Sequence, residues 1–177
     1  MLGLPKLKAI ALLRNFELKS VEIEASNLES LVFKHTSLPC QINLGLCENL
    51  KKLVLHSCCI TDKWLHDILL SKHQLIDCLD LVDYFILKMI KILSHRMKSL
   101  TIIDCYKLVE VDIVTPNLHR LKYKGDFTSF SLNSLSLLEF ILFFLGETSL
   151  NAEMIEFLSK LSQPKLLTWT LDEDKVF

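Results

Sequence analysis

The chain has 177 residues, half of them hydrophobic, and its 20 lysine and arginine residues nearly balance its 21 aspartate and glutamate residues. This length allows one domain with its own core, and the balanced charge gives no electrostatic reason to expect a nucleic-acid partner or an anionic membrane. The longest apolar run, residues 137–145, is interrupted by Glu139 and is much shorter than the roughly 18 residues that a transmembrane helix requires.

An apolar triplet spaced Leu-x-x-Leu-x-Leu recurs along the chain at intervals of 20 to 28 residues, which is typical of leucine-rich repeats. The predicted units start at Leu7, Leu28, Leu50, Ile76, Met97, Leu118, Leu138 and Leu166. Their fourth positions are Ile10, Leu31, Leu53, Leu79, Leu100, Leu121, Ile141 and Trp169, and their sixth positions are Leu12, Phe33, Leu55, Leu81, Ile102, Tyr123, Phe143 and Leu171. Each unit predicts one strand whose fourth and sixth side chains point into the core.

The ninth position of each unit tests this register, because the chain turns inward there and its buried backbone needs a small polar neighbour. The ninth residues are Asn15, Thr36, Cys58, Tyr84, Cys105, Asp126, Gly146 and Asp174. Leucine-rich repeats favour asparagine or cysteine there; five of these eight are asparagine, cysteine or aspartate, and Tyr84 departs from the pattern. Cys58 and Cys105 are therefore predicted to be buried structural thiols.

Three of the segments between strands have helical spacing, with Thr61 and Asp62 as the predicted cap of the first helix and Asn151 as the cap of the third. Their apolar faces are predicted, in chain order, to be Trp64, Leu65, Ile68 and Leu69; Phe85, Ile86, Met89, Ile90 and Leu93; and Met154, Ile155, Leu158 and Leu161.

Other connecting segments have the spacing of a second strand. Residues 18–23 and 108–113 repeat the strand pattern 11 residues after a unit start, and residues 39–44 do so more weakly. Strands this close in sequence cannot both lie in one parallel sheet, because a parallel connection needs a crossover of about a dozen residues. They are predicted to lie on the convex back.

The predicted fold class is α/β: a right-handed leucine-rich-repeat solenoid, or horseshoe, of about eight turns, with a parallel inner sheet and with helices and short strands mixed on the convex side. Residues 1–177 are predicted to form a single domain.

Two segments share a more specific pattern. Residues 18–34, LKSVEIEASNLESLVFK, align without gaps on residues 108–124, LVEVDIVTPNLHRLKYK. The shared pattern resembles the I-x-A-P-N-L-x-S-L-x-Y segment of plant F-box/LRR proteins, and residues 49–62, NLKKLVLHSCCITD, are similar to the same family. The resemblance covers most of the chain.

In that family an N-terminal F-box binds the Skp1 adaptor of an SCF-type ubiquitin ligase, and the repeats select the substrate. The resemblance therefore implies a non-catalytic, substrate-binding repeat region. We expect a fragment without an F-box and without a C-terminal cap, and hence no binding to the Skp1 adaptor. Three alternatives are the repeat domain of an intracellular immune receptor, a degenerate fragment without function, and an enzyme. The lack of a paired nucleophile and base counts against the enzyme.

No residue pattern indicates a catalytic, cofactor or metal site. The cysteines lack the spacing of a zinc site, and the cluster of His56, Cys58 and Cys59 is better explained by reduced thiols. Ser57 and His56 are adjacent and so point to opposite faces of a strand, which separates a nucleophile from its base. With no signal peptide and no N-glycosylation sequon, the chain is predicted to be cytoplasmic or nuclear.

A protein partner is expected on the concave face, to which the third, fifth and seventh side chains of each unit project because side chains alternate along a strand. The candidate residues are Lys52, His56, Asp80, Arg120, Lys122, Lys124, Phe140 and Phe144. In this register the cations of the sixth strand lie beside an apolar seventh strand, as in an interface with an anchor and a polar rim. The alternative is that Phe140 and Phe144 are core residues covered by further C-terminal chain.

Overall fold

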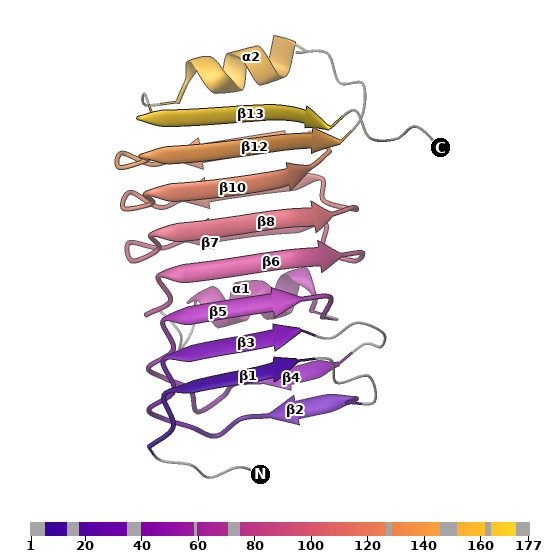
Figure 1. Cartoon of the computed structure of the whole chain (residues 1–177), viewed down its shortest axis with the longest axis vertical. Helices are drawn as coiled ribbons and strands as arrows, with labels where there is room; N and C mark the ends of the chain where they lie inside the picture. Colours follow the sequence, from indigo (N-terminus) through magenta and orange to yellow (C-terminus); the bar gives the residue numbers. More distant parts are fainter. Residues whose placement is uncertain are drawn as a thin grey trace.

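The computed structural model describes residues 6–13, 18–34, 40–58, 60–70, 75–126, 129–145, 152–161 and 164–172. These residues form a stack of parallel strands in two layers (Figure 1). The front layer is one eight-stranded sheet in the order β1-β3-β5-β6-β8-β10-β12-β13, with every neighbouring pair parallel. Its strands are β1 (Ala9–Leu13), β3 (Ser30–Lys34), β5 (Lys52–His56), β6 (Cys78–Tyr84), β8 (Ser99–Cys105), β10 (Arg120–Gly125), β12 (Glu139–Leu145) and β13 (Leu166–Asp172).

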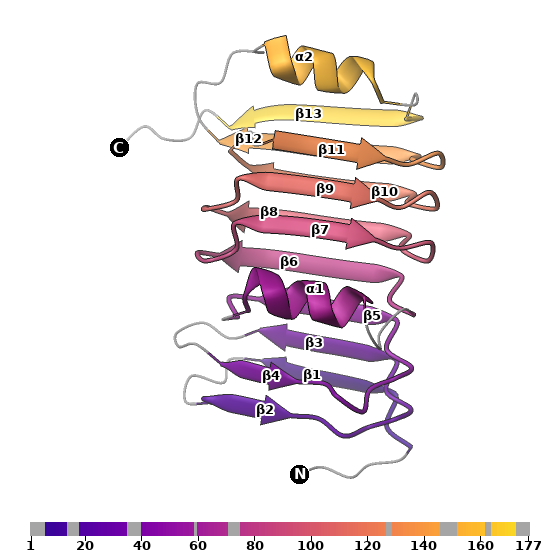
Figure 2. The same ribbon diagram turned by 180° about the vertical axis from the view of Figure 1, so that it is seen from behind.

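The back layer is made of shorter elements, seen in front in Figure 2. Two small parallel sheets lie there, one in the order β2-β4 and one in the order β11-β9-β7. Helix α1 lies between these two sheets, and α2 lies at the C-terminal end of the stack. The elements are β2 (Ser20–Glu22), β4 (Gln41–Asn43), α1 (Asp62–Leu70), β7 (Met89–Leu93), β9 (Glu110–Val114), β11 (Ser129–Asn133) and α2 (Ala152–Ser159). The predicted parallel solenoid is confirmed, and it is consistent with a leucine-rich-repeat fold.

The core lies between the two layers. Front-layer residues such as Leu100 and Leu121, and back-layer residues such as Val111 and Ile113, are fully buried there. Backbone hydrogen bonds join each turn to the next, because strands of the same layer pair directly along the stack. Stability is therefore spread over repeated contacts between neighbouring turns, as in other solenoids.

The prediction of a helix over residues 85–93 is wrong, since β7 occupies Met89–Leu93 as a strand. Ile90 and Ile92 are buried and their neighbours are exposed, which is the alternation of a half-buried strand. The apolar residues of 85–93 also match helical spacing, so the hydrophobic pattern alone does not distinguish a helix from a strand here. Pairing with β9 in the next turn favours the strand.

Helices occupy the other two segments, with differences in detail. Thr61 caps α1, because its Oγ1 accepts a hydrogen bond from the backbone N of Trp64 at 3.1 Å. The face predicted for α2 is partly wrong: Ile155 is exposed, and Phe157 packs against the core together with Leu158. The predicted cap at Asn151 lies outside the described residues.

The register predicted for the last two units is also wrong. Leu121 of β10 pairs with Phe140, one residue before the predicted Ile141. The seventh unit therefore starts at Leu137, which is buried, and not at the exposed Leu138. In the eighth unit Phe140 pairs with Leu167, so Leu167 takes the fourth position and Trp169 takes the sixth.

Thr115 carries a buried hydroxyl whose Oγ1 has no hydrogen-bond partner among the described residues. Ala25, at the same place in the first of the two aligned segments, is buried with no polar side-chain atom. We expect Thr115→Val to raise the free energy of unfolding by about 1 kcal/mol, because a buried polar atom without a partner is removed at constant shape. Urea unfolding of both chains measures the change, and a less stable variant would contradict this reading.

Candidate functional site

The open face of the eight-stranded sheet is the surface that points away from the back layer. The pairing register arranges its side chains in three rows that run across the strands, with neighbours about 4.8 Å apart. The first row is Ser30, Lys52, Cys78, Ser99, Arg120 and Glu139; the second is Val32, Val54, Asp80, Thr101, Lys122 and Ile141; the third is Lys34, His56, Val82, Ile103, Lys124 and Phe143.

The three predicted cations of β10 lie together on this face, and each has a partner. Arg120 Nε lies 2.6 Å from Glu139 Oε2, and this ion pair raises the pKa of the arginine. Lys124 Nζ lies 3.7 Å from Asp104 Oδ1. Lys122 Nζ lies 5.5 Å from the centre of the Phe143 ring, which is a cation–π distance. The arrangement holds positive charge beside an aromatic ring.

Lys52, His56 and Asp80 lie on β5 and β6 of the same face. His56 is half-buried, and this burial lowers the pKa of its imidazole. Lys34 lowers the pKa further, while Asp80 and Asp83 act in the opposite direction. Because the pKa falls below its usual value of 6.5, the ring is mainly neutral at pH 7, a form in which one nitrogen can donate and the other can accept a hydrogen bond.

The prediction that Phe140 belongs to the open face is wrong, and the alternative that it is a core residue is confirmed, with Phe130 and Phe157 among the residues that cover it. Its side chain points to the other side of β12, where it is fully buried between the layers. Its ring centre lies 6.5 Å from that of Phe130 and 6.1 Å from that of Phe157. The side chain of Phe144, also predicted for the open face, lies outside the part of the structure that is described. Phe143, which the predicted register placed in the core, is instead the aromatic residue that lies beside these cations on the open face.

Ser57 and the aspartates near it have structural roles at the end of the strands. Ser57, Asp83 and Asp104 have positive φ values of 52°, 64° and 53°, so the chain turns sharply at the same place in three successive turns. The Ser57 hydroxyl donates a hydrogen bond to Asp83 Oδ2 at 2.7 Å and so is not activated by His56. This serine therefore ties one turn to the next.

The predicted burial of Cys58 and Cys105 is confirmed. The five described cysteines are free thiols, and burial raises the pKa of Cys105 to about 12, which keeps it protonated. The described residues contain no group of histidine, cysteine, aspartate and glutamate side chains that could hold a metal ion. Within the same part of the chain, no helix has the length and apolarity to cross a membrane.

Comparison with protein families finds one match that covers most of the chain. The family described as "At1g61320/AtMIF1, LRR domain" matches residues 22–172, which include all the strands of both layers except β1 and the start of β2. Comparison with curated proteins finds no match, and comparison with solved structures finds none either. The repeat pattern, the parallel two-layered stack and this match together show that the chain belongs to the At1g61320/AtMIF1 leucine-rich-repeat domain family.

Proposed function

We propose that the chain recognises a protein partner through the open face of its eight-stranded sheet. The observation that carries this proposal is the group formed by Arg120, Lys122 and Phe143, in which an exposed arginine and a half-buried lysine border an aromatic ring. Arginine and aromatic residues are enriched in protein interfaces, where an aromatic anchor is surrounded by a polar rim. Leucine-rich-repeat solenoids are typically binding scaffolds without catalysis, and this agrees with a recognition role.

We further propose that the role is substrate selection in an SCF-type ubiquitin ligase receptor, without catalysis and in the cytoplasm or nucleus. The likeness of residues 18–34 and 108–124 to plant F-box/LRR proteins supports the receptor role, and the free thiols support a reducing compartment. Each strand of the front layer then marks one turn of a right-handed solenoid of about eight turns, the arrangement expected of leucine-rich repeats.

The gene sequence upstream of Met1 tests the ligase role. An F-box there is the expected result, whereas a nucleotide-binding domain would assign the repeats to an immune receptor. We also expect that the 177-residue chain will not co-purify with the Skp1 adaptor, and co-purification would contradict this expectation.

Charge reversal tests the open face as the binding surface. We expect Arg120→Glu with Lys122→Glu to weaken binding of the proteins captured by the wild-type chain by roughly tenfold or more, because the partner's charges then meet repulsion. Quantitative co-purification from cell extract measures the loss. Lys63→Glu with Lys107→Glu, at exposed positions outside the open face, is the matched control. Equal capture by both variants would exclude the open face.

A further inference from the structure

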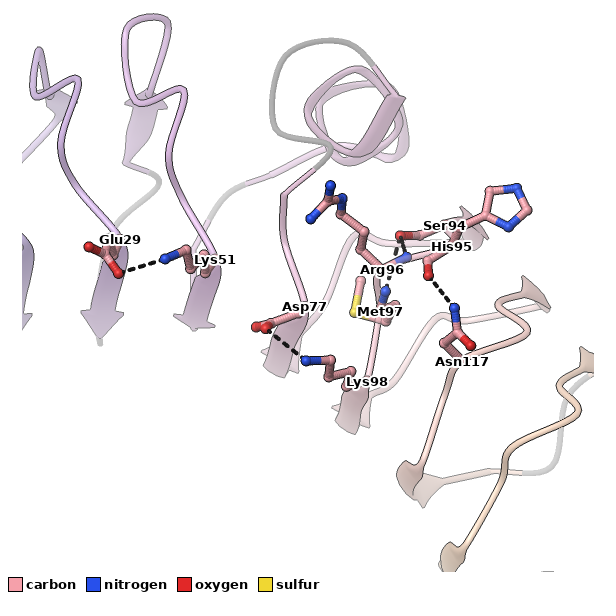
Figure 3. A network of polar contacts seen from close by, with 9 residues as sticks. All are labelled: Glu29, Lys51, Asp77, Ser94, His95, Arg96, Met97, Lys98 and Asn117. Carbon is pink, nitrogen blue, oxygen red and sulfur yellow. Dashed lines mark hydrogen bonds and ion pairs between the residues drawn. The ribbon is translucent and has the colours of Figure 1, made fainter.

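A second charged surface lies at the N-terminal edge of the eight-stranded sheet, where its strands begin (Figure 3). The residue just before each of the first five strands of this sheet carries charge of alternating sign, in the order Lys8, Glu29, Lys51, Asp77 and Lys98, and His119 precedes the sixth strand. Each backbone N–H in this series donates to the preceding member's carbonyl at 2.8 or 2.9 Å, which fixes the spacing. We call this series the edge ladder.

Ion pairs between neighbouring members partly neutralise the charges of the edge ladder. Glu29 lies 3.0 Å from Lys8 and 2.8 Å from Lys51, and Asp77 lies 3.9 Å from Lys98. These contacts stabilise little, because the lysines are exposed and such pairs are worth at most about 1 kcal/mol. The side chains of Lys51 and Lys98 are 51% and 62% exposed, so both cations remain accessible.

Arg96 adds a cation that has no ion-pair partner among the described residues. Asn49 and Asn117 each lie one residue before the start of their repeat unit. Their side-chain amides donate hydrogen bonds at 2.7 Å to backbone carbonyls of the preceding turn, those of Ser26 and His95. Arg96 occupies this position in the fifth unit, and there Ser94 Oγ accepts from the backbone N of Arg96 and of Met97 at 3.2 Å. The Arg96 guanidinium makes no ion pair or hydrogen bond with the described residues and lies apart from the drawn ion pairs in Figure 3.

These groups meet in a groove with a volume of about 340 Å³. Its lining includes Lys51, Asp77, Arg96, Lys98, Asn117 and His119. The lining therefore holds three permanent cations and one carboxylate, Asp77, which lies next to Lys98. Lys51 is paired with Glu29, outside this lining, and Arg96 has no such partner among the described residues. The groove has an excess of positive charge in a chain whose net charge is −1.

We propose that this groove binds an acidic segment of a protein partner, with the Arg96 guanidinium as the main contact to a carboxylate. A guanidinium presents a planar pair of donors that matches a carboxylate. The acids within the edge ladder favour a peptide with separate carboxylates over a nucleic-acid backbone, whose continuous charge would be repelled by Glu29 and Asp77. The site is separate from the open face, because its lining residues lie before the strands and not at the outward-facing positions along them.

Fluorescence anisotropy with a fluorescein-labelled peptide of alternating glutamate and serine tests the proposal on the whole chain. We expect the wild-type chain to bind this peptide, with binding that weakens at high salt, and not to bind the same peptide with glutamine for glutamate. Arg96→Gln should weaken binding roughly tenfold, with a smaller loss for Lys98→Gln. Lys107→Gln removes an exposed cation elsewhere and should bind like the wild type.

Several results would overturn the proposal. They are the absence of wild-type binding, equal binding by Arg96→Gln, and equal binding of the glutamine peptide. Equal affinity for a labelled oligothymidine, with the same loss in Arg96→Gln, would assign the groove to nucleic acid instead. The Arg120→Glu, Lys122→Glu variant should keep its peptide affinity, so this site and the open face can fail separately. Thermal unfolding of Arg96→Gln should match the wild type, because the side chain is exposed.

Discussion

Replacement of Phe140 by alanine should lower the free energy of unfolding by about 3 to 5 kcal/mol, the range for large aromatic side chains removed from a core. Phe140 is fully buried and has ring contacts with Phe130 on the back layer and with Phe157 on α2. Its loss would leave a cavity where the sheet, the back layer and the last helix meet. Urea unfolding of the whole chain measures the difference.

Phe143→Ala is the matched control, because it makes the same change on the same strand at a side chain that faces outward. It is half-buried and contacts Lys122, so we expect a loss below about 1 kcal/mol. If Phe140→Ala unfolds the chain under all conditions, Phe140→Leu should still show a measurable loss. A larger loss for Phe143→Ala than for Phe140→Ala would restore the register in which Ile141 and Phe143 are the core residues.

This pair of residues also shows why the repeat pattern predicted most of the front sheet but missed its end. The triplet Leu137, Phe140 and Leu142 and the triplet shifted by one residue are both wholly apolar, so hydrophobicity cannot choose between them. A shift of one residue exchanges the two faces of a strand. In the earlier units polar residues such as Lys52 and Arg120 lie between the apolar positions and fix the register. Contacts with Phe130 and Phe157 select the observed register, and these arise only from the folded stack.

The candidate sites were likewise predicted only in part from the sequence. Strand alternation was enough to place Lys52, His56, Asp80 and the β10 cations on one face. Arg96 was missed because it lies before its strand, outside the positions that the alternation rule covers. Comparison of Asn49, Arg96 and Asn117, each one residue before a unit start, was the signal that could have identified it. The sequence alone does not show that this position has a structural role; the hydrogen bonds of the two asparagines in the structure show it.

Replacement of Trp64 by alanine should lower the free energy of unfolding by about 3 kcal/mol, the lower end for such truncations because the side chain is only partly buried. Trp64 lies on α1, which separates the two small sheets of the back layer. Its Nε1 donates to the carbonyl of Ile42 on β4 at 2.9 Å, and Asp62 Oδ1 accepts from the backbone N of Lys88, just before β7, at 3.0 Å. The helix thus satisfies backbone groups of the elements on both of its sides.

Trp64→Phe separates the two contributions of this side chain. It keeps most of the apolar contact but removes the donor to Ile42, so we expect a loss of about 1 to 2 kcal/mol. Lys63→Ala, on the exposed side of the same helix, should change stability by less than about 0.5 kcal/mol. Chemical unfolding of the three variants measures these differences. If Trp64→Phe were as stable as the wild type, the hydrogen bond to β4 would have no net role, and α1 would be held to its neighbours by apolar packing and by Asp62. Equal losses for Trp64→Ala and Lys63→Ala would instead show that the helix does not join the two back sheets.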